Sequence, residues 1–308
     1  MLSETMNITG YGHSSYARAL VEFGTSLYLP CSEGTILKRS ISGFPYSDAM
    51  GCYPIFACQD WSRLGVDLEM LSRELVSLSV VTDPFGQYDE NLLQDCFKDV
   101  VKPFKEHFVV DLSLPKDSYV HPHHQRNARK ALDKIAVERC ESPITHLDEW
   151  ISLYQVLIER HQIKGLTAFS PQSFAKQLTV PGIEAFHAIY DGAIIGMLLW
   201  YVQGNIAYYH LGAYNPIGYE LRASFALFSY AIDYFSKNQL DWLSLGAGAG
   251  VDSNGMDGLT RYKQGWSTGT RTAYFCGRIF NPKLYQEIVS TKGIPPTNFF
   301  PAYRAGEF

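Results

Sequence analysis

Between residues 121 and 280 the hydrophobic pattern switches repeatedly between the helical and the strand period, which constrains the fold more than any other feature. The predicted order is a helix, a strand, two helices, three strands, a long helix, a strand, a short helix and a last strand. These elements are expected at 121–134, 136–140, 145–165, from 170 onward, 185–190, 193–202, 206–211, 219–237, 241–245, 259–264 and 271–280. Single strands mixed with helices in this way predict an α/β (α+β) fold with a mixed sheet.

Turn and cap residues set several of these boundaries. Asp191-Gly192 and Gln203-Gly204-Asn205 are typical of tight turns, so the three strands from residue 185 are expected to pair as a meander. Ser170 followed by Pro171 is typical of a helix start. Thr145 with Asp148 three residues later resembles a capping box, which predicts another helix start there.

The first third of the chain shows a less regular mixture of the same elements. Strands are expected at 26–29, 35–41, 50–57, 76–81 and 107–112, and helices at 66–75 and 90–104. This part is interpreted as a degenerate copy of the later unit. The segment Leu114-Pro115-Lys116-Asp117 is the best candidate for a hinge. The predicted division is therefore 1–115, 116–280 and a tail, 281–308, that packs back on the first domain.

Composition limits the partners and the compartment. The net charge is -5, so binding of DNA or RNA would need a local basic patch. Such a patch is present on the helix expected at 121–134, where Arg126, Arg129, Lys130 and Lys134 either contact phosphates or form a solvated face. The six cysteines form no CxxC pair and are expected to be reduced thiols. With no signal-like N-terminus and no apolar run long enough for a bilayer, we expect a soluble cytoplasmic protein without membrane insertion.

The stretch from Leu245 to Trp266, LGAGAGVDSNGMDGLTRYKQGW, is the most informative motif. It resembles the segment of FemAB-type transferases in which a strand, a Gly/Asp-rich loop and a short helix precede an aromatic-Lys-x-Gly-aromatic element. Here that element is Tyr262-Lys263-Gln264-Gly265-Trp266, and the segment HHQRNARKAL at 123–132 resembles the basic helix of the same family. The resemblance, which covers about residues 105–280, implies two tandem GNAT-like units. It also implies transfer of an acyl or aminoacyl group to the amine of a sugar, an amino acid or a cell-envelope precursor.

The resemblance gives Lys263 a catalytic role. Attack of an amine on an ester or thioester produces an oxyanion, and a fixed ammonium group stabilises that charge. By position in the motif this role falls on Lys263, with Tyr262 and Trp266 lining the substrate cleft. The alternative is a solvated lysine on a short helix.

The region before the long helix departs from the pattern of GNAT enzymes that bind acetyl-CoA. Those enzymes carry glycines whose backbone N–H groups hold the pyrophosphate. Here Arg222 is present without the glycines, so Arg222 and Ser224 either meet a phosphate of the donor or form a plain helix start. No tightly bound cofactor is expected, and acyl-CoA remains a candidate co-substrate. Transfer RNA is a possible donor that the acidic composition does not favour, and DNA is not expected.

Further candidates come from neighbouring segments. Strand alternation places Tyr208 and His210 on one face and Tyr209 on the other, so His210 is either a base for the attacking amine or a core histidine, and Tyr208 would contact substrate. Asp252 and Asp257 flank the glycine-rich loop and either orient the amine or shape the turn.

Two other patterns are weaker. His121-Pro122-His123-His124 lacks a second group of ligands, so no metal site is predicted. Gly246, Gly248 and Gly250 have the wrong spacing for a dinucleotide loop.

Three functional hypotheses remain open on the sequence. The first is an N-acyltransferase that uses an acyl-CoA or similar donor. The second is an aminoacyl-tRNA-dependent transferase acting on a peptidoglycan precursor. The third is a non-catalytic binding protein that retains the fold, since fold alone does not decide function.

Overall fold

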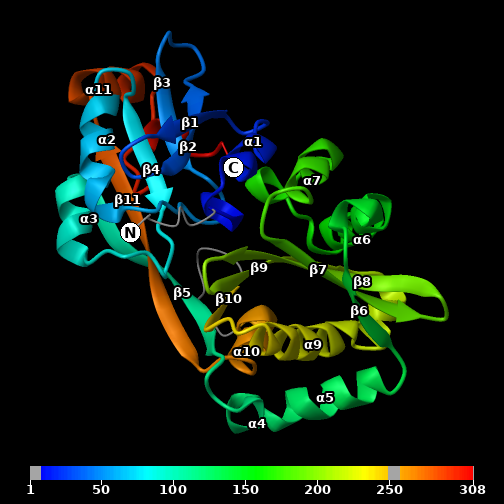
Figure 1. Cartoon of the computed structure of the whole chain (residues 1–308). Coiled ribbons are helices and arrows are strands. Elements are labelled where there is room, and N and C mark those ends of the chain that lie inside the picture. The colour runs from blue at the N-terminus through cyan, green and yellow to red at the C-terminus, as the bar shows by residue number, and fades with distance from the viewer. Residues whose placement is uncertain (1–7, 249–256, 308) are drawn as a thin grey trace. The chain divides into compact units, whose positions relative to one another are not determined.

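The computed structural model describes residues 8–248 and 257–307, which form two compact units (Figure 1). The larger unit comprises the described parts of Met1–Gly10, Lys105–Ile163 and Ser170–Arg271. The smaller unit comprises the described parts of Tyr11–Phe104, Lys164–Phe169 and Thr272–Phe308. The two units therefore alternate along the chain, and each takes segments from both halves of the sequence.

The sheet of the larger unit has the strand order β5-β10-β9-β8-β7-β6. The bounds are β5 (Val100–Asp111), β6 (Ala136–Cys140), β7 (Ile183–Tyr190), β8 (Ala193–Gln203), β9 (Ile206–Tyr214) and β10 (Trp242–Gly246). Strands β6 to β9 pair antiparallel, β10 runs parallel to β9, and β5 is antiparallel to β10. At the turn between β7 and β8, Asp191 and Gly192 have φ values of 51° and 75°, which confirms the predicted tight turn.

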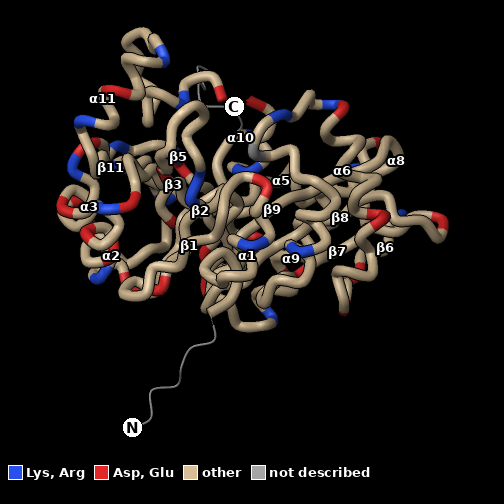
Figure 2. Tube along the Cα trace, turned by 90° about the horizontal axis from the view of Figure 1, so that it is seen from above, with Lys and Arg blue, Asp and Glu red and all other residues tan. Residues whose placement is uncertain are grey.

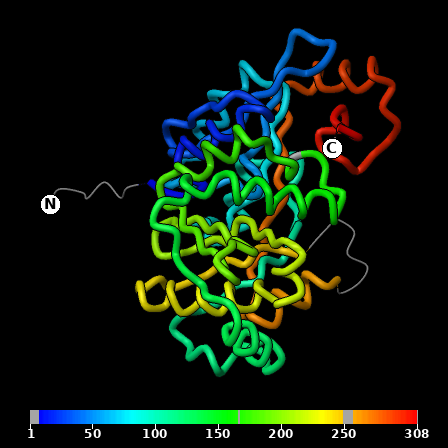
Figure 3. Tube along the Cα trace, turned by 90° about the vertical axis from the view of Figure 1, so that its right-hand side faces the viewer, coloured from blue at the N-terminus to red at the C-terminus, as the bar shows by residue number. Residues whose placement is uncertain are grey.

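Helices cover both faces of this sheet (Figures 1 and 3). The bounds are α4 (Lys116–Tyr119), α5 (Pro122–Leu132), α6 (Leu147–His161), α7 (Pro171–Gln177), α8 (Pro216–Glu220), α9 (Ala223–Lys237) and α10 (Gly258–Gln264), with a 3-10 turn η3 (Pro143–His146). Helix α9 packs on β7, β8 and β9 and against α5, while α6 packs on β8 and β9 from the other side. The fully buried Trp200 of β8 lies between Phe228 and Phe235 of α9, so aromatic rings fill the core on that face.

The smaller unit repeats the same pairing pattern. Its strands have the order β1-β2-β3-β4-β11 and are β1 (Thr25–Leu29), β2 (Gly34–Ser40), β3 (Ser47–Gly51), β4 (Ser77–Val81) and β11 (Gly269–Ile279). An antiparallel meander, β1-β2-β3, is followed by a parallel strand, β4, and an antiparallel closing strand, β11. The larger unit has the same sequence of pairings in β7-β8-β9, β10 and β5. The repeat confirms that the chain contains two related α/β halves.

The closing strands are exchanged between the two parts of the chain. Strand β5 belongs to the larger unit from Lys105 onward although it follows the smaller unit's strands in sequence, and β11 belongs to the smaller unit from Thr272 onward. The remaining helices of the smaller unit are α1 (Ser14–Ala19), α2 (Leu64–Leu71), α3 (Glu90–Cys96) and α11 (Pro282–Thr291), with 3-10 turns η1 (Gly10–Gly12), η2 (Trp61–Arg63), η4 (Gly165–Thr167) and η5 (Ala302–Arg304).

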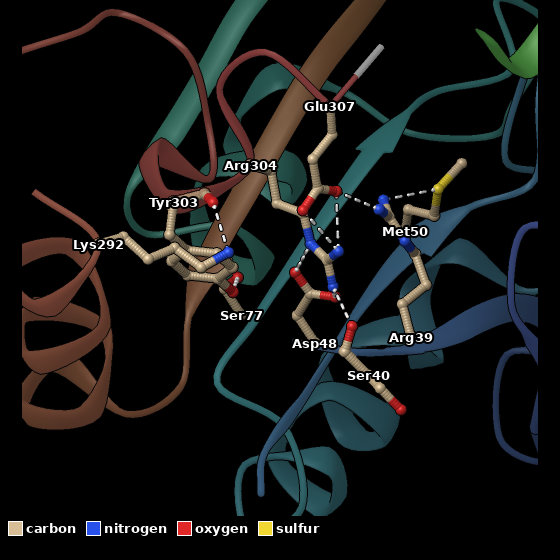
Figure 4. Close-up of polar contacts among 9 residues, drawn as sticks. All are labelled: Arg39, Ser40, Asp48, Met50, Ser77, Lys292, Tyr303, Arg304 and Glu307. Carbon is tan, nitrogen blue, oxygen red and sulfur yellow. Dashed lines mark hydrogen bonds and ion pairs between the residues drawn. The ribbon is translucent and has the colours of Figure 1, made fainter. Parts of the chain in front are cut away.

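The last residues are fastened to the smaller unit's sheet by a buried ion pair (Figure 4). The guanidinium of Arg304 donates to both carboxylate oxygens of Asp48, at 2.8 and 2.7 Å, and to the carbonyl oxygen of Ser40 at 2.9 Å. Glu307 accepts from Arg304 and also from Arg39, at 2.7 Å in the second case. Because removing one member of a buried ion pair leaves an unpaired charge, breaking this contact costs about 3–5 kcal/mol.

Two predicted helices are wrong in extent. The helix expected at 90–104 ends at Cys96, and Val100 to Phe104 belong to β5; Pro103 and the β-branched Val100 and Val101 disfavour a helix there. The long helix expected at 219–237 is divided into α8 and α9, because Arg222 adopts a left-handed conformation with φ 60° and ψ 40°.

One smaller expectation about a helix start also fails. The predicted capping box does not form: α6 begins at Leu147 after His146, and the Thr145 hydroxyl donates to the carbonyl of Ser142 instead. By contrast, Ser170 caps α7 as predicted by accepting from the Ser173 N–H at 3.1 Å.

Within residues 8–248 and 257–307, none of the helices combines the length and the apolar character needed to cross a bilayer.

Candidate functional site

Lys263 lies on α10 with its amine buried in the larger unit. Asp257 caps α10, its carboxylate accepting from the Thr260 N–H at 2.7 Å, and this starts the helix at a fixed residue. The Lys263 side chain is 6% exposed, and its Nζ donates to the carbonyl oxygen of Ala247 at 2.6 Å. The same Nζ lies 5.6 Å from the centre of the Tyr209 ring. The ammonium is therefore held at the end of β10.

The two parallel strands stop pairing at this point. The β9–β10 register runs from Trp242 opposite Ile206 to Ser244 opposite Tyr208, after which β9 continues to Tyr214 without β10. Gly246 has φ 73°, a left-handed conformation that glycine adopts without strain, and a side chain there would begin 3.2 Å from Lys263 Nζ. A glycine at the strand end thus lets the chain leave the sheet and makes room for the amine.

Burial controls the charge of this amine. Removal from water lowers the pKa of Lys263 to about 7, with the charge of Lys105 adding to the effect and that of Asp257 opposing it. The side chain consequently exchanges between ammonium and amine at neutral pH. A group in this condition can donate a proton, accept one, or stabilise a negative charge that forms beside it.

His107 of β5 belongs to the same site, although no sequence motif singles it out. Burial, followed by the charges of Lys263 and Lys105, lowers the pKa of His107 to about 3, so its imidazole is neutral. Its Nδ1 lies 3.5 Å from the Ser244 hydroxyl. We call Lys263 and the residues around its amine the Lys263 cluster. Ala247 and Tyr209 contact the amine, the charges of Lys105 and Asp257 shift its pKa, and the charge of Lys263 acts on His107, whose neighbour is Ser244.

The aromatic residues that flank Lys263 in sequence pack α10 onto its neighbours. Trp266 is fully buried and meets His124 of α5 edge to face, with ring centres 5.1 Å apart. The Tyr262 hydroxyl donates to the carbonyl oxygen of Ser224 at 3.0 Å, and its ring contacts Phe225 of α9. In this structure the fully buried Trp266 exposes no surface to a ligand, and both aromatic side chains hold α10, and with it Lys263, in place.

Gly265 completes this packing. A side chain at that position would begin 2.1 Å from the imidazole of His124, closer than any side chain can approach. The glycine of the aromatic-Lys-x-Gly-aromatic element is therefore a packing requirement between α10 and α5.

Tyr208 and His210 lie on the face of β9 opposite to Tyr209, as strand alternation predicts. His210 contacts the ring of Tyr201, which is paired with Tyr208, and its Nε2 lies 2.8 Å from the Gln177 amide oxygen. The β8–β9 register skips one residue at His210, so this histidine is the extra residue of a β-bulge. Burial lowers the pKa of His210 to about 3, so it too is neutral.

Arg222 and Ser224 lie at the start of α9. Arg222 is exposed as a residue and its guanidinium donates to the side-chain oxygen of Asn127, while no side chain of the described residues caps the helix. Asp252 lies outside the described residues. Of the sequence-predicted residues, the structure thus brings Lys263, Tyr262 and Trp266 together on or next to α10. It places Arg222 and Ser224 beside them at α9, and Tyr208 and His210 on the far side of β9.

The basic residues of α5 are all exposed. They are Arg126, Arg129 and Lys130, and Lys134, predicted on the same helix, is exposed two residues after the helix ends at Leu132. Figure 2 shows basic and acidic positions interspersed along the rest of the trace. The smaller unit contains a cavity of about 170 Å³ whose lining includes Arg39, Tyr53, Phe300 and Arg304 but not Lys263.

Comparisons with known proteins agree with this arrangement. Residues 123–264 match the family described as acetyltransferase (GNAT) domain. The fold is similar to that of FemX, with 15% identity, 83% of this chain and 86% of the other covered, and a TM-score of 0.62. It is also similar to the C-terminal domain of a putative lysylphosphatidylglycerol synthetase from Agrobacterium fabrum (14% identity, 92% of both chains, TM-score 0.59) and to L-PGS from Bacillus licheniformis (15%, 94% and 98%, 0.57). No curated protein matches the chain in sequence. The expected fold of two GNAT-like units is thus confirmed.

Proposed function

We propose that this chain, which carries a GNAT acetyltransferase domain and belongs with the FemAB-like branch of that superfamily, transfers an acyl or aminoacyl group from an activated donor to an amine. The observation that carries the proposal is the buried Lys263 amine, placed where β9 and β10 stop pairing. A fixed hydrogen-bond donor in a water-poor site stabilises the oxyanion that forms in acyl transfer.

The proposed reaction proceeds through a tetrahedral intermediate. The amine nitrogen of the acceptor bonds to the carbonyl carbon of the donor, and the carbonyl oxygen becomes an oxyanion to which Lys263 Nζ donates a hydrogen bond. The intermediate collapses as the bond to the donor's sulfur or oxygen breaks, and the proton lost by the amine ends on that leaving group. The developing negative charge favours the ammonium form of Lys263, whose free pKa of about 7 makes either form accessible.

Other residues of the cluster support this role. Ala247 accepts a hydrogen bond from Nζ and so directs the ammonium, and the neutral His107 adds no competing positive charge. His210, outside the cluster, remains a candidate base, although it lies on the face of β9 opposite to Tyr209 and an imidazole whose pKa is near 3 binds a proton weakly at neutral pH. Arg222 and Ser224, at the uncapped start of α9, are the candidates for a phosphate of the donor.

The proposed acceptor and donor rest only on the names of proteins with a similar fold and on the resemblance in sequence. One similar structure is a domain of a putative lysylphosphatidylglycerol synthetase, which by its name makes an aminoacylated lipid. We propose a cell-envelope precursor as acceptor on this similarity, a sugar amine or an amino acid as acceptor on the resemblance to FemAB-type transferases, and acyl-CoA or a similar ester as donor. An aminoacyl-tRNA donor is the second candidate, favoured by the exposed basic residues of α5, which would contact its phosphates.

The test is a transfer assay read by mass spectrometry. The purified chain is offered acetyl-CoA, longer acyl-CoAs or aminoacyl-tRNA, each with a panel of amines that includes cell-envelope precursors. We expect product with one donor class, and a loss of about 100- to 1000-fold in kcat/KM for Lys263→Met, which keeps the packing but removes the charge. Lys237→Ala, an exposed lysine at the end of α9, is the control and should retain full activity.

Two outcomes would count against the proposal. Equal activity of Lys263→Met and the unaltered chain would remove the assigned role of Lys263. Binding of a donor without transfer to any amine would favour a non-catalytic binding protein.

A further inference from the structure

Three potential metal ligands that acyl transfer does not use lie together at the outer edge of the larger unit's sheet. They are Cys140 at the end of β6, His146 at the end of η3 and His187 in β7, and we call them the Cys140 cluster. One ligand atom from each lies within 4.8 Å of the others. The Cys140 sulfur is 3.2 Å from His187 Nδ1, and the two imidazole rings meet edge to face with centres 4.9 Å apart.

Local structure explains the meeting of these side chains. Strands β6 and β7 pair with Glu138 opposite His187 and Cys140 opposite Ala185, so His187 is the diagonal neighbour of Cys140. Pro143 starts η3 directly after the strand, and this turn brings His146 back over the strand end. Cys140 and His187 are buried, at 2% and 7% exposure, and His146 is half-buried.

We propose that the Cys140 cluster binds a transition-metal ion, for which Zn²⁺ is the best match. One thiolate and two imidazoles are the ligand types that zinc prefers. In a tetrahedral zinc site the ligand atoms lie roughly 3.5 Å apart, given bonds of about 2.0–2.3 Å. The present separations are close to this spacing: Cys140 Sγ lies 3.2 Å from His187 Nδ1, and one ligand atom of each residue lies within 4.8 Å of the others. Three protein ligands leave the fourth position to water.

The surroundings of the cluster suit a cation. Glu138 Oε2 lies 3.5 Å from His187 Nε2, a buried atom that makes no hydrogen bond to any residue the structure describes. A carboxylate beside the second nitrogen of a metal-bound histidine is the usual outer partner, because it orients the ring. Burial raises the pKa of Cys140 to about 12; the Arg139 charge opposes this and those of Glu138, Glu184 and Glu149 add to it. Binding therefore forms a metal–sulfur bond and releases the thiol proton to solvent.

The ion would tie η3 to the two outer strands. His146 is also the residue that precedes α6, so a metal bond at His146 fixes the start of the helix that packs on β8 and β9. The histidine-rich segment at 121–124 has no such arrangement: His121 Nδ1 accepts from the His123 N–H, and the His123 ring contacts the Asn127 amide.

The test measures metal directly on the full-length chain, purified without a histidine tag or chelator. We expect about one zinc ion per chain by elemental mass spectrometry. After chelation and reloading with Co²⁺, we expect the thiolate-to-cobalt absorption band. Cys140→Ser should abolish that band and weaken zinc binding by at least about 10-fold. Cys276→Ser, which removes a buried thiol of the smaller unit, is the matched control and should leave both unchanged.

Clear results would overturn the proposal. A chain that retains no zinc and shows no cobalt–thiolate band has no site, and equal binding by Cys140→Ser would place the metal elsewhere. Should Cys140→Ser fail to fold, His146→Asn at the half-buried position carries the same test, and unchanged cobalt spectra in that variant would likewise reject the cluster.

Discussion

At the scale of single residues, the ionisation of Lys263 decides how the proposed reaction depends on pH. Its pKa of about 7 in the free protein is a consequence of burial. If the ammonium stabilises the oxyanion, kcat/KM is highest below pH 7 and falls as the pH rises through that value, since kcat/KM reports the free enzyme. Deprotonation of the acceptor amine raises kcat/KM as the pH rises, which opposes the effect of Lys263. Two acceptors must therefore be compared, one with a pKa far above 7 and one with a lower pKa.

The measurement is kcat/KM from pH 5 to 9 with both acceptors. Lys263→Arg keeps a positive charge throughout this range and should lose the descending limb near pH 7. A rise in kcat/KM through pH 7 that disappears in Lys263→Met would instead assign the neutral amine of Lys263 as the base.

The sequence predicts some residues of the candidate site and not others, for a physical reason. Lys263 was found because its aromatic and glycine neighbours are adjacent in sequence, within one short motif. His107 was not found, because its partner Ser244 lies on a strand more than a hundred residues later. The Cys140 cluster was missed for the same reason: Cys140 and His187 meet only through β6–β7 pairing.

At the scale of elements, the packing of α10 explains the glycine of the motif and can be tested there. Gly265→Ala would place a methyl group against the His124 ring, which is itself held by Tyr262 and Trp266. We expect Gly265→Ala to lower the free energy of unfolding by about 1–3 kcal/mol and to reduce transfer activity, because α10 carries Lys263.

Gly258→Ala is the matched control for this substitution. It lies on the same helix, and a side chain there meets no described residue within 4 Å. Chemical denaturation of both variants should separate them, with Gly258→Ala close to the unaltered chain. If Gly265→Ala proved equally stable, His124 would have to move freely, and the packing role assigned to the glycine would be wrong.

Element positions were predicted well where hydrophobic period and turn chemistry agree. The β7–β9 meander is of this kind, because Asp191-Gly192 fixes the first turn and alternation fixes the faces. The prediction was wrong at Val100 to Phe104, where apolar residues happen to fall at helical spacing within a strand. It was also wrong at Arg222, where a single residue in the left-handed conformation divides two helices. This residue is neither glycine nor proline, so the sequence carries no signal of the break.

At the scale of the whole molecule, the order of elements was legible in the sequence for the later unit and less regular in the first third, and the exchange of closing strands was not legible at all. The partner of a closing strand is set by burial and by pairing with a strand more than a hundred residues away. The hydrophobic pattern within one segment carries no information about that partner. The predicted division at 115 and 280 implies that residues 116–280 fold by themselves. The position of β5 makes this testable.

A fragment comprising residues 116–280 lacks β5 and so leaves β10 without the partner that pairs from Trp242–Asp111 to Gly246–Phe108. It also loses Val110 from the core, while retaining residues 272–280, which belong to the smaller unit. A fragment comprising 105–271 restores β5 and omits that surplus. An unpaired strand edge and the loss of a core strand both lower the free energy of unfolding. We therefore expect thermal unfolding, monitored by circular dichroism, to be cooperative for 105–271 and not for 116–280. Cooperative unfolding of 116–280 with equal stability would mean that β5 is dispensable and that the chain divides at 115.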